Sequence, residues 1–336
     1  MSIQTKVDQI IKNLGSISIQ DFIEISNFDS EGFYNTENNN KISIKGHFIT
    51  SPEITPLFGY TICNQFLKKF PNPKTIHLLE LGPGNGTLTQ DVITFFKSHN
   101  ISIGQITLIE KSIYFQKKLA AKFSNKVNIY ESLSQIDRKN DEILFIYSNE
   151  FFDAVGSKQF IFKKNAFFEI AITKNQNLYK LIYQHSLLSD YLKEYYCSYD
   201  FKDGDILEHS NQILNILEEI KINLKGSFFF SATDYGYKKI SKKNSLRLIS
   251  NHEKVNFFEQ FENVDYSFGV NFELINNFFL NFKPIISTQK DLINNFLPKQ
   301  FKNSNDEETL KAIELIKGKE FDDIGNSFYN FSFYKK

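Results

Sequence analysis

Residues 76–87 read Ile-His-Leu-Leu-Glu-Leu-Gly-Pro-Gly-Asn-Gly-Thr, and this stretch decides the fold. An apolar run that ends near the carboxylate of Glu80 passes directly into a turn with glycine at positions 82, 84 and 86. Glycine reaches positive φ angles without strain and has no Cβ, so a ligand can lie against the main chain where the next helix begins. The stretch predicts a strand, a turn and a helix that together cradle a nucleotide.

Strand and helix patterns alternate on the C-terminal side of this turn. The predicted elements are strand 75–81, helix 87–98, strand 105–110, helix 112–123, strands 126–130 and 143–148, helix 209–223 and strand 227–233. Such alternation is typical of a parallel sheet with helices on both faces, the α/β class. Residues 157–184 interrupt it with two apolar runs around a Lys-Lys-Asn turn, which predicts an inserted antiparallel segment.

The remaining segments are assigned around this core. Helical spacing occurs at 2–13 and 18–27, and Thr50-Ser51-Pro52-Glu53 has the hydroxyl and proline of a helix start. We therefore expect six regions: 1–70, N-terminal helices and a pocket-closing segment; 71–156, the first half of the core; 157–205, an inserted antiparallel and helical lobe; 206–236, where the core resumes; 237–282, a second insertion; and 283–336, C-terminal strands that close the sheet.

Composition narrows the function classes. The chain has 336 residues with 39 basic and 39 acidic side chains, so no net field attracts nucleic acid or an anionic membrane surface. No apolar run reaches the roughly 18–20 residues of a membrane-spanning helix. Cys63 and Cys197 do not form a disulfide framework or a metal motif. With no signal or transit peptide pattern at the N-terminus, we expect a cytoplasmic protein without a metal site.

Polar residues follow three of the predicted strands. They are Glu80 with the glycine turn, Glu110-Lys111-Ser112, and Asn149-Glu150-Phe151-Phe152-Asp153. In an open parallel sheet the carboxyl ends of the strands line the ligand crevice, so these groups are expected to converge. A carboxylate at Glu110 can accept hydrogen bonds from both hydroxyls of a ribose. Ribose recognition alone does not distinguish a methyl donor from a nicotinamide dinucleotide.

The spacing of the turn separates these two cofactors. A dinucleotide fingerprint is Gly-x-Gly-x-x-Gly and places a pyrophosphate at the helix N-terminus. Here the order is Glu80-x-Gly82-x-Gly84-x-Gly86, and the acid before the first glycine favours a cationic amine over a pyrophosphate. S-adenosylmethionine carries an ammonium and a sulfonium but no phosphate. It is therefore the preferred cofactor, with an ordinary strand-to-helix turn without ligand as the alternative.

Several motifs in order resemble the MidA-type S-adenosylmethionine-dependent methyltransferases, which include the mitochondrial arginine methyltransferase that assists complex I assembly. The resemblance spans 32–328, and its most specific parts are 46–54 with Phe58-Gly59, 80–88, 149–154 and Asp234-Tyr235-Gly236. It implies a class I methyltransferase fold, a Rossmann-like sheet with helices on both faces, plus a smaller substrate lobe built from the N-terminal segment and the insertions.

The same resemblance implies roles for particular residues. Those expected around the cofactor are Glu80, Gly82, Pro83, Gly84, Gly86, Thr87, Glu110, Lys111, Thr50, Ser51 and Asn149. Those expected on the acceptor side as catalytic groups are Glu150, Asp153, Glu53 and Asp234. The chain departs from the family pattern at His47, Tyr60, Gly156 and Asn271.

Methyl transfer from a sulfonium is an in-line displacement that depends mainly on positioning and on exclusion of water. If the acceptor is arginine, its guanidinium keeps its charge and must be oriented, which suits a bidentate carboxylate. We therefore expect protein arginine N-methylation, with Glu150 as the guanidinium clamp and a respiratory complex I subunit as the protein substrate that the resemblance implies. Two alternatives stay open: methylation of a nucleobase or small molecule, and a cofactor-binding assembly factor with little catalysis.

Overall fold

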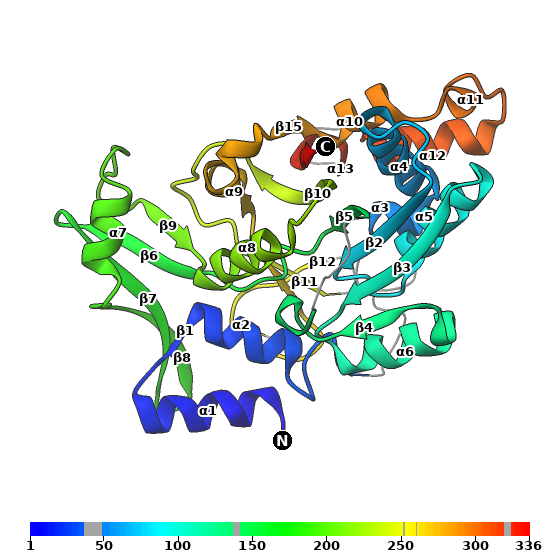
Figure 1. Cartoon of the computed structure of the whole chain (residues 1–336). Coiled ribbons are helices and arrows are strands. Elements are labelled where there is room, and N and C mark those ends of the chain that lie inside the picture. The colour runs from blue at the N-terminus through cyan, green and yellow to red at the C-terminus, as the bar shows by residue number, and fades with distance from the viewer. Residues whose placement is uncertain (37–48, 137–141, 251–252, 260, 319–323) are drawn as a thin grey trace. The chain divides into compact units, whose positions relative to one another are not determined.

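The computed structural model describes residues 1–36, 49–136, 142–250, 253–259, 261–318 and 324–336 (Figure 1). The chain forms two compact units, each assembled from three segments. The core unit consists of Glu37–Phe152, Ile216–Lys238 and Val270–Lys336, and the lobe unit of Met1–Thr36, Asp153–Asn215 and Lys239–Gly269. No helix in the described residues is long and apolar enough to cross a membrane.

The core unit contains one mixed sheet. Its strands are β2 (Thr75–Leu81), β3 (Ser102–Ile109), β4 (Asn128–Tyr130), β5 (Ile143–Asn149), β10 (Phe228–Tyr237), β14 (Val270–Asn271), β15 (Ile285–Thr288) and β16 (Phe328–Lys335). Their order is β15-β16-β10-β5-β2-β3-β4, with β14 paired to the end of β10. The pairs from β10 to β4 are parallel, whereas β16 runs antiparallel to both β10 and β15.

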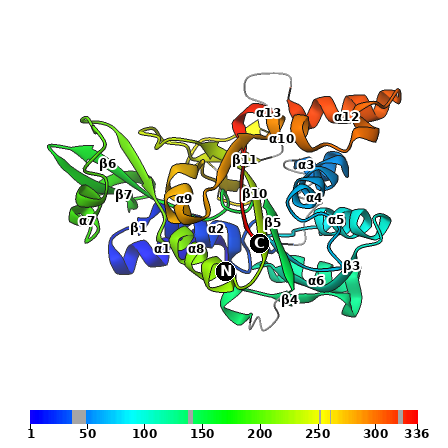
Figure 2. The ribbon, with the colours of Figure 1, turned by 45° about the horizontal axis from the view of Figure 1, so that its top comes forward.

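The order in which strands are added reverses between β2 and β5. From β2 the chain proceeds outward through β3 to β4 and then returns to place β5 on the other side of β2. Such a reversal leaves a crevice beyond the carboxyl ends of the two strands, because the connections leave in opposite directions. The glycine turn follows β2, and Glu150 follows β5, so both predicted motifs lie at this reversal. Figure 2 shows β5 and β10 side by side within the same sheet.

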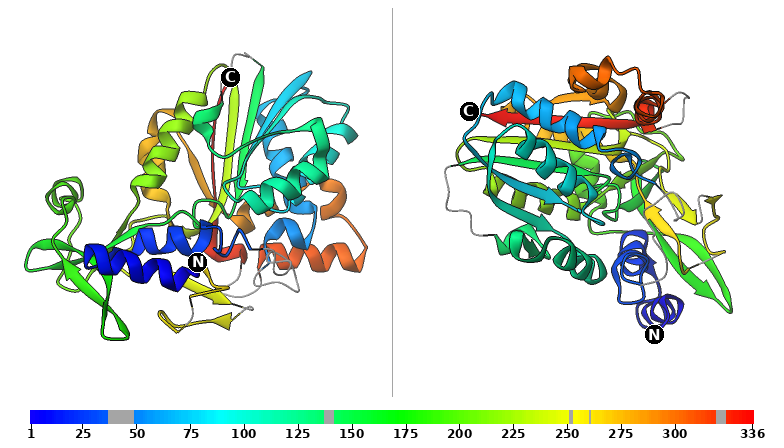
Figure 3. Two further views of the ribbon diagram at one scale, coloured as in Figure 1. Left: turned by 90° about the horizontal axis from the view of Figure 1, so that it is seen from below. Right: turned by 90° about the vertical axis from the view of Figure 1, so that its right-hand side faces the viewer.

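Helices cover both faces of this sheet. The α-helices are α3 (Ser51–Ile54), α4 (Leu57–Lys69), α5 (Thr87–Ser98), α6 (Ile113–Phe123), α8 (Asn211–Asn223, which begins in the lobe unit), α9 (Phe272–Phe278), α10 (Gln289–Phe296), α11 (Lys299–Lys302), α12 (Glu307–Lys317) and α13 (Ile324–Ser327). Short 3-10 helices are η1 (Ser124–Lys126), η2 (Leu133–Gln135) and η3 (Leu280–Phe282). Figure 3 shows α5 and α6 on one side of the strands and α8 and α9 on the other.

Covering both faces explains the sequence of the central strands. Six of the seven residues of β2 are buried, as expected for a parallel strand with helices on each side. On the α4 and α5 face, the ring of Phe66 lies 5.0 Å from that of Phe145 and 5.6 Å from that of Phe96. Each fully buried aromatic side chain of this kind contributes roughly 1.5–3 kcal/mol of hydrophobic stabilisation.

The lobe unit is mainly antiparallel. Its strands are β1 (Ile17–Ser18), β6 (Lys158–Lys163), β7 (Ala166–Asn175), β8 (Leu178–Gln184), β9 (Ile206–His209), β11 (Arg247–Ser250), β12 (Glu253–Lys254) and β13 (Asp265–Ser267), and its helices are α1 (Ile3–Leu14), α2 (Ile19–Phe28) and α7 (Ser189–Tyr195). One sheet has the order β1-β7-β6-β9 with β8 on β7, and the other has the order β12-β11-β13.

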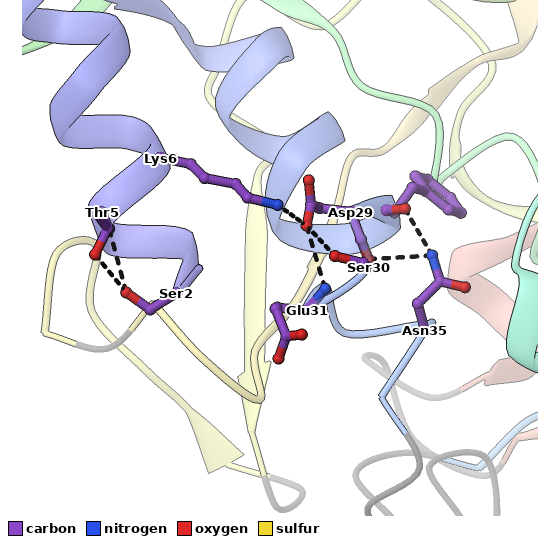
Figure 4. A network of polar contacts seen from close by, with 8 residues as sticks. Ser2, Thr5, Lys6, Asp29, Ser30, Glu31 and Asn35 are labelled. Carbon is purple, nitrogen blue, oxygen red and sulfur yellow. Dashed lines mark hydrogen bonds and ion pairs between the residues drawn. The ribbon is translucent and has the colours of Figure 1, made fainter.

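Polar contacts hold the first two helices of the lobe unit together. Ser2 caps α1, and Lys6 of that helix pairs with Asp29 at the end of α2 (Figure 4). The Asp29 carboxylate also accepts the backbone N–H of Glu31, 3.2 Å away. The lysine pair and the hydrogen bonds together lower the pKa of Asp29, although burial opposes them.

The predicted α/β fold with a smaller second unit is confirmed, but several boundaries differ. The helix predicted from 50 to 70 is divided into α3 and α4, because Pro56 supplies no N–H to continue α3. Residues 50–70 lie in the core unit and not with the N-terminal helices. The C-terminal strands predicted to close the sheet are present as β15 and β16, and α10 to α13, which the sequence pattern did not indicate, lie between them. Residues 237–282 contain the small β12-β11-β13 sheet, which the sequence pattern did not reveal.

Candidate functional site

The glycine turn is shaped by the protein's own packing. Gly82, Gly84 and Gly86 have φ angles of 65°, 51° and 69°, a region that other residues enter only with strain. The Gly82 N–H donates to Ile109 O at 2.9 Å, and the Gly86 N–H donates to the carbonyl of Pro83 at 2.7 Å. A Cβ at Gly86 would lie 2.6 Å from Cε2 of Phe123, so α6 presses directly on the turn. The predicted strand, turn and helix are therefore present at the predicted place.

Glu110 ties the end of β3 to this turn. Its Oε2 accepts the N–H of Gly84 at 3.2 Å, and its Oε1 accepts the N–H of Ser112 at 2.8 Å. Burial raises the pKa of Glu110 to about 7, although these backbone donors and that of Lys111 favour the ionised form. A carboxylate has about four lone-pair sites, so the three backbone donors leave capacity for a hydroxyl donor. The Lys111 side chain is exposed, and its contribution here comes from the backbone.

Glu80 lies beneath the turn and not in an open crevice. It is 2% exposed, and its carboxyl accepts the hydroxyl of Thr89 on α5. Burial raises its pKa to about 8, against the opposing hydrogen bonds. This hydrogen bond with Thr89 links β2 to α5, so the structure gives Glu80 an anchoring contact, while its contact with the cofactor stays a prediction.

The predicted pocket-closing segment lies on the turn. Glu53 of α3 accepts hydrogen bonds at Oε1 from Asn85 Nδ2 at 3.1 Å and from Thr87 Oγ1 at 2.7 Å. Thr50, the N-cap residue of α3, and Ser51 are buried. Ser51 Oγ accepts a hydrogen bond from Gln289 Nε2 at 2.8 Å. The segment is therefore held between the glycine turn and α10.

Asn149 and Glu150 stand at the end of β5. Glu150 has a φ of 53°, and its N–H donates to the carbonyl of Thr233 at 2.9 Å. Its Oε1 accepts Asn149 Nδ2 at 2.9 Å, whereas Asn149 Oδ1 is buried and has no hydrogen-bond partner in the described part of the chain. Strained backbone at a ligand crevice is a common feature of functional sites. A buried acceptor of this kind matches an incoming N–H or O–H donor.

The loop after β5 packs directly against the glycine turn. A Cβ at Gly82 would lie 2.8 Å from Cδ2 of Phe151, so the Phe151 ring covers that glycine. Asp234, fully buried on β10, accepts the N–H of Phe152 at 3.0 Å through Oδ1. Asp234 thereby holds the loop that carries Glu150. Phe151 and Asn85 were not among the predicted site residues, although both lie inside the motifs that located the site.

Asp153 belongs to the lobe unit, unlike the other candidate residues. Burial raises its pKa to about 7, and the neighbouring Asp265 adds to this, while Arg247 opposes it. Asp265 is also buried, with a pKa raised to about 6, and accepts the Tyr34 hydroxyl at 2.6 Å. The structure thus groups Asp153 with Asp265 in the lobe, and its catalytic role stays a prediction.

The departures from the family pattern have structural explanations where they are described. The Tyr60 ring packs at a tilt against Phe95 and Phe301, with ring centroids 5.7 and 5.8 Å away. Asn271 caps α9, accepting the Leu274 N–H at 3.2 Å, and an amide performs this role as well as a carboxylate. Gly156 lies against Gln20. His47 and the start of the 46–54 motif lie outside the described residues.

These residues fit a cofactor that presents hydroxyls and an N–H donor. The Glu110 carboxylate retains acceptor capacity, Asn149 Oδ1 lacks a partner among the described residues, and no side chain caps the N-terminus of α5 at Gly86. In the described residues no cluster of His, Cys, Asp and Glu could hold a metal ion. The acceptor groups of Glu110 and Asn149 suit an organic cofactor held by hydrogen bonds.

Comparison with known proteins agrees with this geometry. Residues 60–283 match the family of S-adenosyl-L-methionine-dependent methyltransferases. The protein arginine methyltransferase NDUFAF7 of Xenopus laevis mitochondria is 36% identical over 92 residues, 26% of this chain and 21% of that protein. The Caenorhabditis elegans homologue is 27% identical over 249 residues, 64% of this chain and 56% of that protein. The chain thus spans from a fifth to just over half of these curated relatives.

The fold is shared with a solved structure. A Burkholderia thailandensis protein, crystallised with S-adenosyl-homocysteine, superimposes with a TM-score of 0.81 over 99% of this chain and 92% of that one. The sequence identity is 14%, so this likeness establishes the fold and not the substrate.

Proposed function

The chain belongs to the S-adenosyl-L-methionine-dependent methyltransferase family, and we propose that it methylates an arginine side chain of a protein. The relatives named as protein arginine methyltransferases support this acceptor. The site supports it through one observation above the others. Glu150 is held at the end of β5, two residues from the point where Phe152 is fixed by Asp234, and its neighbour Phe151 covers Gly82 of the donor turn.

This position suits a guanidinium. An ionised Glu150 can pair with two N–H groups of arginine and orient the third nitrogen, because the guanidinium is planar and its donors form a fixed fork. Asn149 Oδ1 lies beside it as a buried acceptor for one further N–H. Carboxylate and amide together favour a cationic, multidonor acceptor over an alkyl or carboxylate acceptor.

The protein's role in the reaction is mainly geometric. S-adenosylmethionine supplies a methyl group on a sulfonium, and the acceptor nitrogen forms a bond to that carbon as the bond to sulfur breaks and the nitrogen then loses a proton. Glu110 and the turn would hold the adenosyl group, and Glu150 would orient the acceptor nitrogen toward the methyl group. Phe151 excludes water from the side of Gly82, which supports a displacement that needs little acid–base chemistry.

The protein substrate is the second part of the proposal. We take a respiratory complex I subunit as the first acceptor to examine, because the motif resemblance is to a group whose mitochondrial member assists complex I assembly. The cytoplasm, predicted from sequence, is the compartment in which to look for it. Methylation of a nucleobase or small molecule, and cofactor binding without transfer, are the outcomes that would replace this proposal.

The test separates acceptor binding from cofactor binding. Purified protein and methyl-tritiated S-adenosylmethionine are added to a lysate of a strain that lacks the gene, and labelled arginine is sought in proteins. We expect Glu150→Gln to lower transfer by about 100-fold, as for loss of a charged group that stabilises a transition state. S-adenosylhomocysteine affinity should stay within about twofold, since the proposal places the Glu150 carboxylate on the acceptor side of the site. The exposed Glu307→Gln, from a surface ion pair with Lys311, is the matched control.

Three results would contradict the proposal. Label confined to nucleic acid or small molecules would assign a different acceptor class. Binding of S-adenosylhomocysteine without transfer to any fraction would support the assembly-factor alternative. Undiminished transfer by Glu150→Gln would remove Glu150 from the acceptor site.

A further inference from the structure

Asn85 is the one residue of the 82–86 turn whose side chain carries both a donor and an acceptor. Both groups are used. Its Nδ2 donates to Glu53 Oε1 at 3.1 Å, and its Oδ1 accepts from Lys118 Nζ at 2.6 Å. An amide can connect a carboxylate to an ammonium in this way because it carries both a donor and an acceptor, whereas an ionised carboxylate has no donor and an alkyl group has neither function. The turn is thus bridged between an acidic and a basic side chain.

The two charged partners come from different elements. Glu53 is on α3, which precedes β2, and Lys118 is on α6, which follows β3. The far side of α3 is fixed by the Gln289 contact to buried Ser51. The α6 helix is fixed by its Ser112 cap and by the Phe123 contact with Gly86. The bridge therefore spans two elements whose positions are set by other contacts.

A second lysine strengthens the α6 side. Lys122 Nζ donates to the backbone carbonyl of Asn85 at 2.9 Å. Lys118 and Lys122 lie one helical turn apart, so they face the same side of α6. Hydrogen bonds to charged groups are roughly twice as strong as those between neutral groups. The tip of the turn is consequently held by charge-assisted bonds from both flanks.

The bonding of Glu53 limits what else this carboxylate can do. Its Oε1 accepts both Asn85 Nδ2 and Thr87 Oγ1, which occupies the roughly two lone-pair sites of that oxygen. A bidentate pair with a guanidinium needs both carboxylate oxygens. Glu53 therefore lacks the free fork that an arginine clamp requires, and this differs from the catalytic role predicted from the sequence.

We propose that Glu53, Asn85 and Lys118 form a positioning bridge that holds the donor turn ready for the cofactor, and that Glu53 does not bind the methyl acceptor. The proposal rests on the cofactor half of the family assignment and is independent of the arginine acceptor. Its consequence is that removing either charge weakens cofactor binding while the rate at saturating cofactor is retained.

The first measurement uses S-adenosylhomocysteine and no acceptor. Isothermal titration should give Lys118→Met a dissociation constant about tenfold above wild type, the effect of losing one charge-assisted hydrogen bond. Lys118→Arg retains a cationic donor and should stay within about threefold. Lys311→Met, which removes the lysine of an exposed helix pair, is the matched control and should not change the affinity. In the cofactor-free protein, amide hydrogen exchange over 84–90 should be faster in Lys118→Met than in the control.

The second measurement tests that Lys118 acts through Asn85. In an Asn85→Ala background, Lys118→Met should add less than about twofold, because residues of one network are not additive. Glu53→Gln should raise the KM for S-adenosylmethionine and leave kcat and the KM for the acceptor within about twofold. Glu53→Gln is nearly isosteric, so it keeps the test valid if a truncation fails to fold.

The outcomes are distinct. Wild-type affinity in Lys118→Met, or a full additional loss in the Asn85→Ala background, overturns the bridge. A rise in the acceptor KM of Glu53→Gln with unchanged cofactor affinity returns Glu53 to the acceptor site and also overturns it. Failure of the wild-type protein to bind S-adenosylhomocysteine would instead refute the cofactor assignment, a different result from either of these.

Discussion

Gly86→Ala provides a test of how tightly the donor turn is packed. Gly86 has a φ of 69°, and an added Cβ would lie 2.6 Å from Phe123 Cε2 and 2.8 Å from Leu119 Cδ2. Real Cβ atoms do not approach other heavy atoms so closely, so either α6 or the turn must move. The substitution therefore combines backbone strain with overpacking.

The size of the effect follows from these two contributions. A non-glycine residue in the left-handed region costs about 1–2 kcal/mol. Overpacking a well-filled site costs about 1–3 kcal/mol. Gly86→Ala should therefore lower the free energy of unfolding by about 2–5 kcal/mol. Gly15→Ala is the matched control, because Gly15 has a φ of 83° and nothing lies within 4 Å of its added Cβ. It should show the backbone contribution alone.

Urea unfolding followed by circular dichroism measures both variants, with free energies obtained by linear extrapolation. The difference between Gly86→Ala and Gly15→Ala should be about 1–3 kcal/mol. Combining Gly86→Ala with Phe123→Leu, which shortens the contacting ring, should recover at least about 0.5 kcal/mol as an interaction energy. Equal destabilisation by the two alanines, with no recovery in the double variant, would refute the contact between α6 and the turn.

Three further predictions concern residues of the core unit. The pKa of Glu80 is about 8 in the folded protein against 4.5 in the unfolded chain, so its stabilising contribution is complete below pH 4.5 and is lost as the pH rises through 8. Glu80→Gln should therefore reduce the loss of stability between pH 5 and pH 9 by a few kcal/mol, at about 1.4 kcal/mol per pKa unit. Urea unfolding at each pH measures this difference. Hydrogen bonds from ribose hydroxyls favour the ionised form of Glu110, whose pKa in the folded protein is about 7. S-adenosylhomocysteine should therefore bind more tightly at pH 8 than at pH 6, and its binding should release protons. Calorimetric titration of the protein with S-adenosylhomocysteine in buffers of different ionisation enthalpy measures this release, which should be absent in Glu110→Gln. Asn271→Asp should keep the α9 cap and change the melting temperature little, whereas Asn271→Ala should cost about 1 kcal/mol, and equal melting of all three proteins would show that the cap contributes nothing.

Local signals in the sequence predicted the central part of the fold because they act over a few residues. The apolar run of β2, the glycines of the turn and the helical start at Thr87 gave the correct elements within a residue or two. The motif at Asn149 and Glu150 was placed correctly at a strand end for the same reason. In contrast, α10 to α12 were missed, because their apolar residues are stabilised by contacts with α4 and α3 from the other end of the chain.

What the sequence by itself determined is a strand, a glycine turn and a carboxylate at Glu110 after the neighbouring strand, each specified by short-range geometry and residue type. Only the tertiary structure decided which groups these residues meet. Folding buries Glu80 against Thr89. It also brings Glu53 and Lys118, each more than thirty positions from Asn85 in the sequence, into contact with the Asn85 side chain. The covering of Gly82 by Phe151 arises in the same way, since β5 returns beside β2 only in the folded sheet. Side-chain periodicity carries no information about such pairings, because they depend on strand order and on which faces the helices cover.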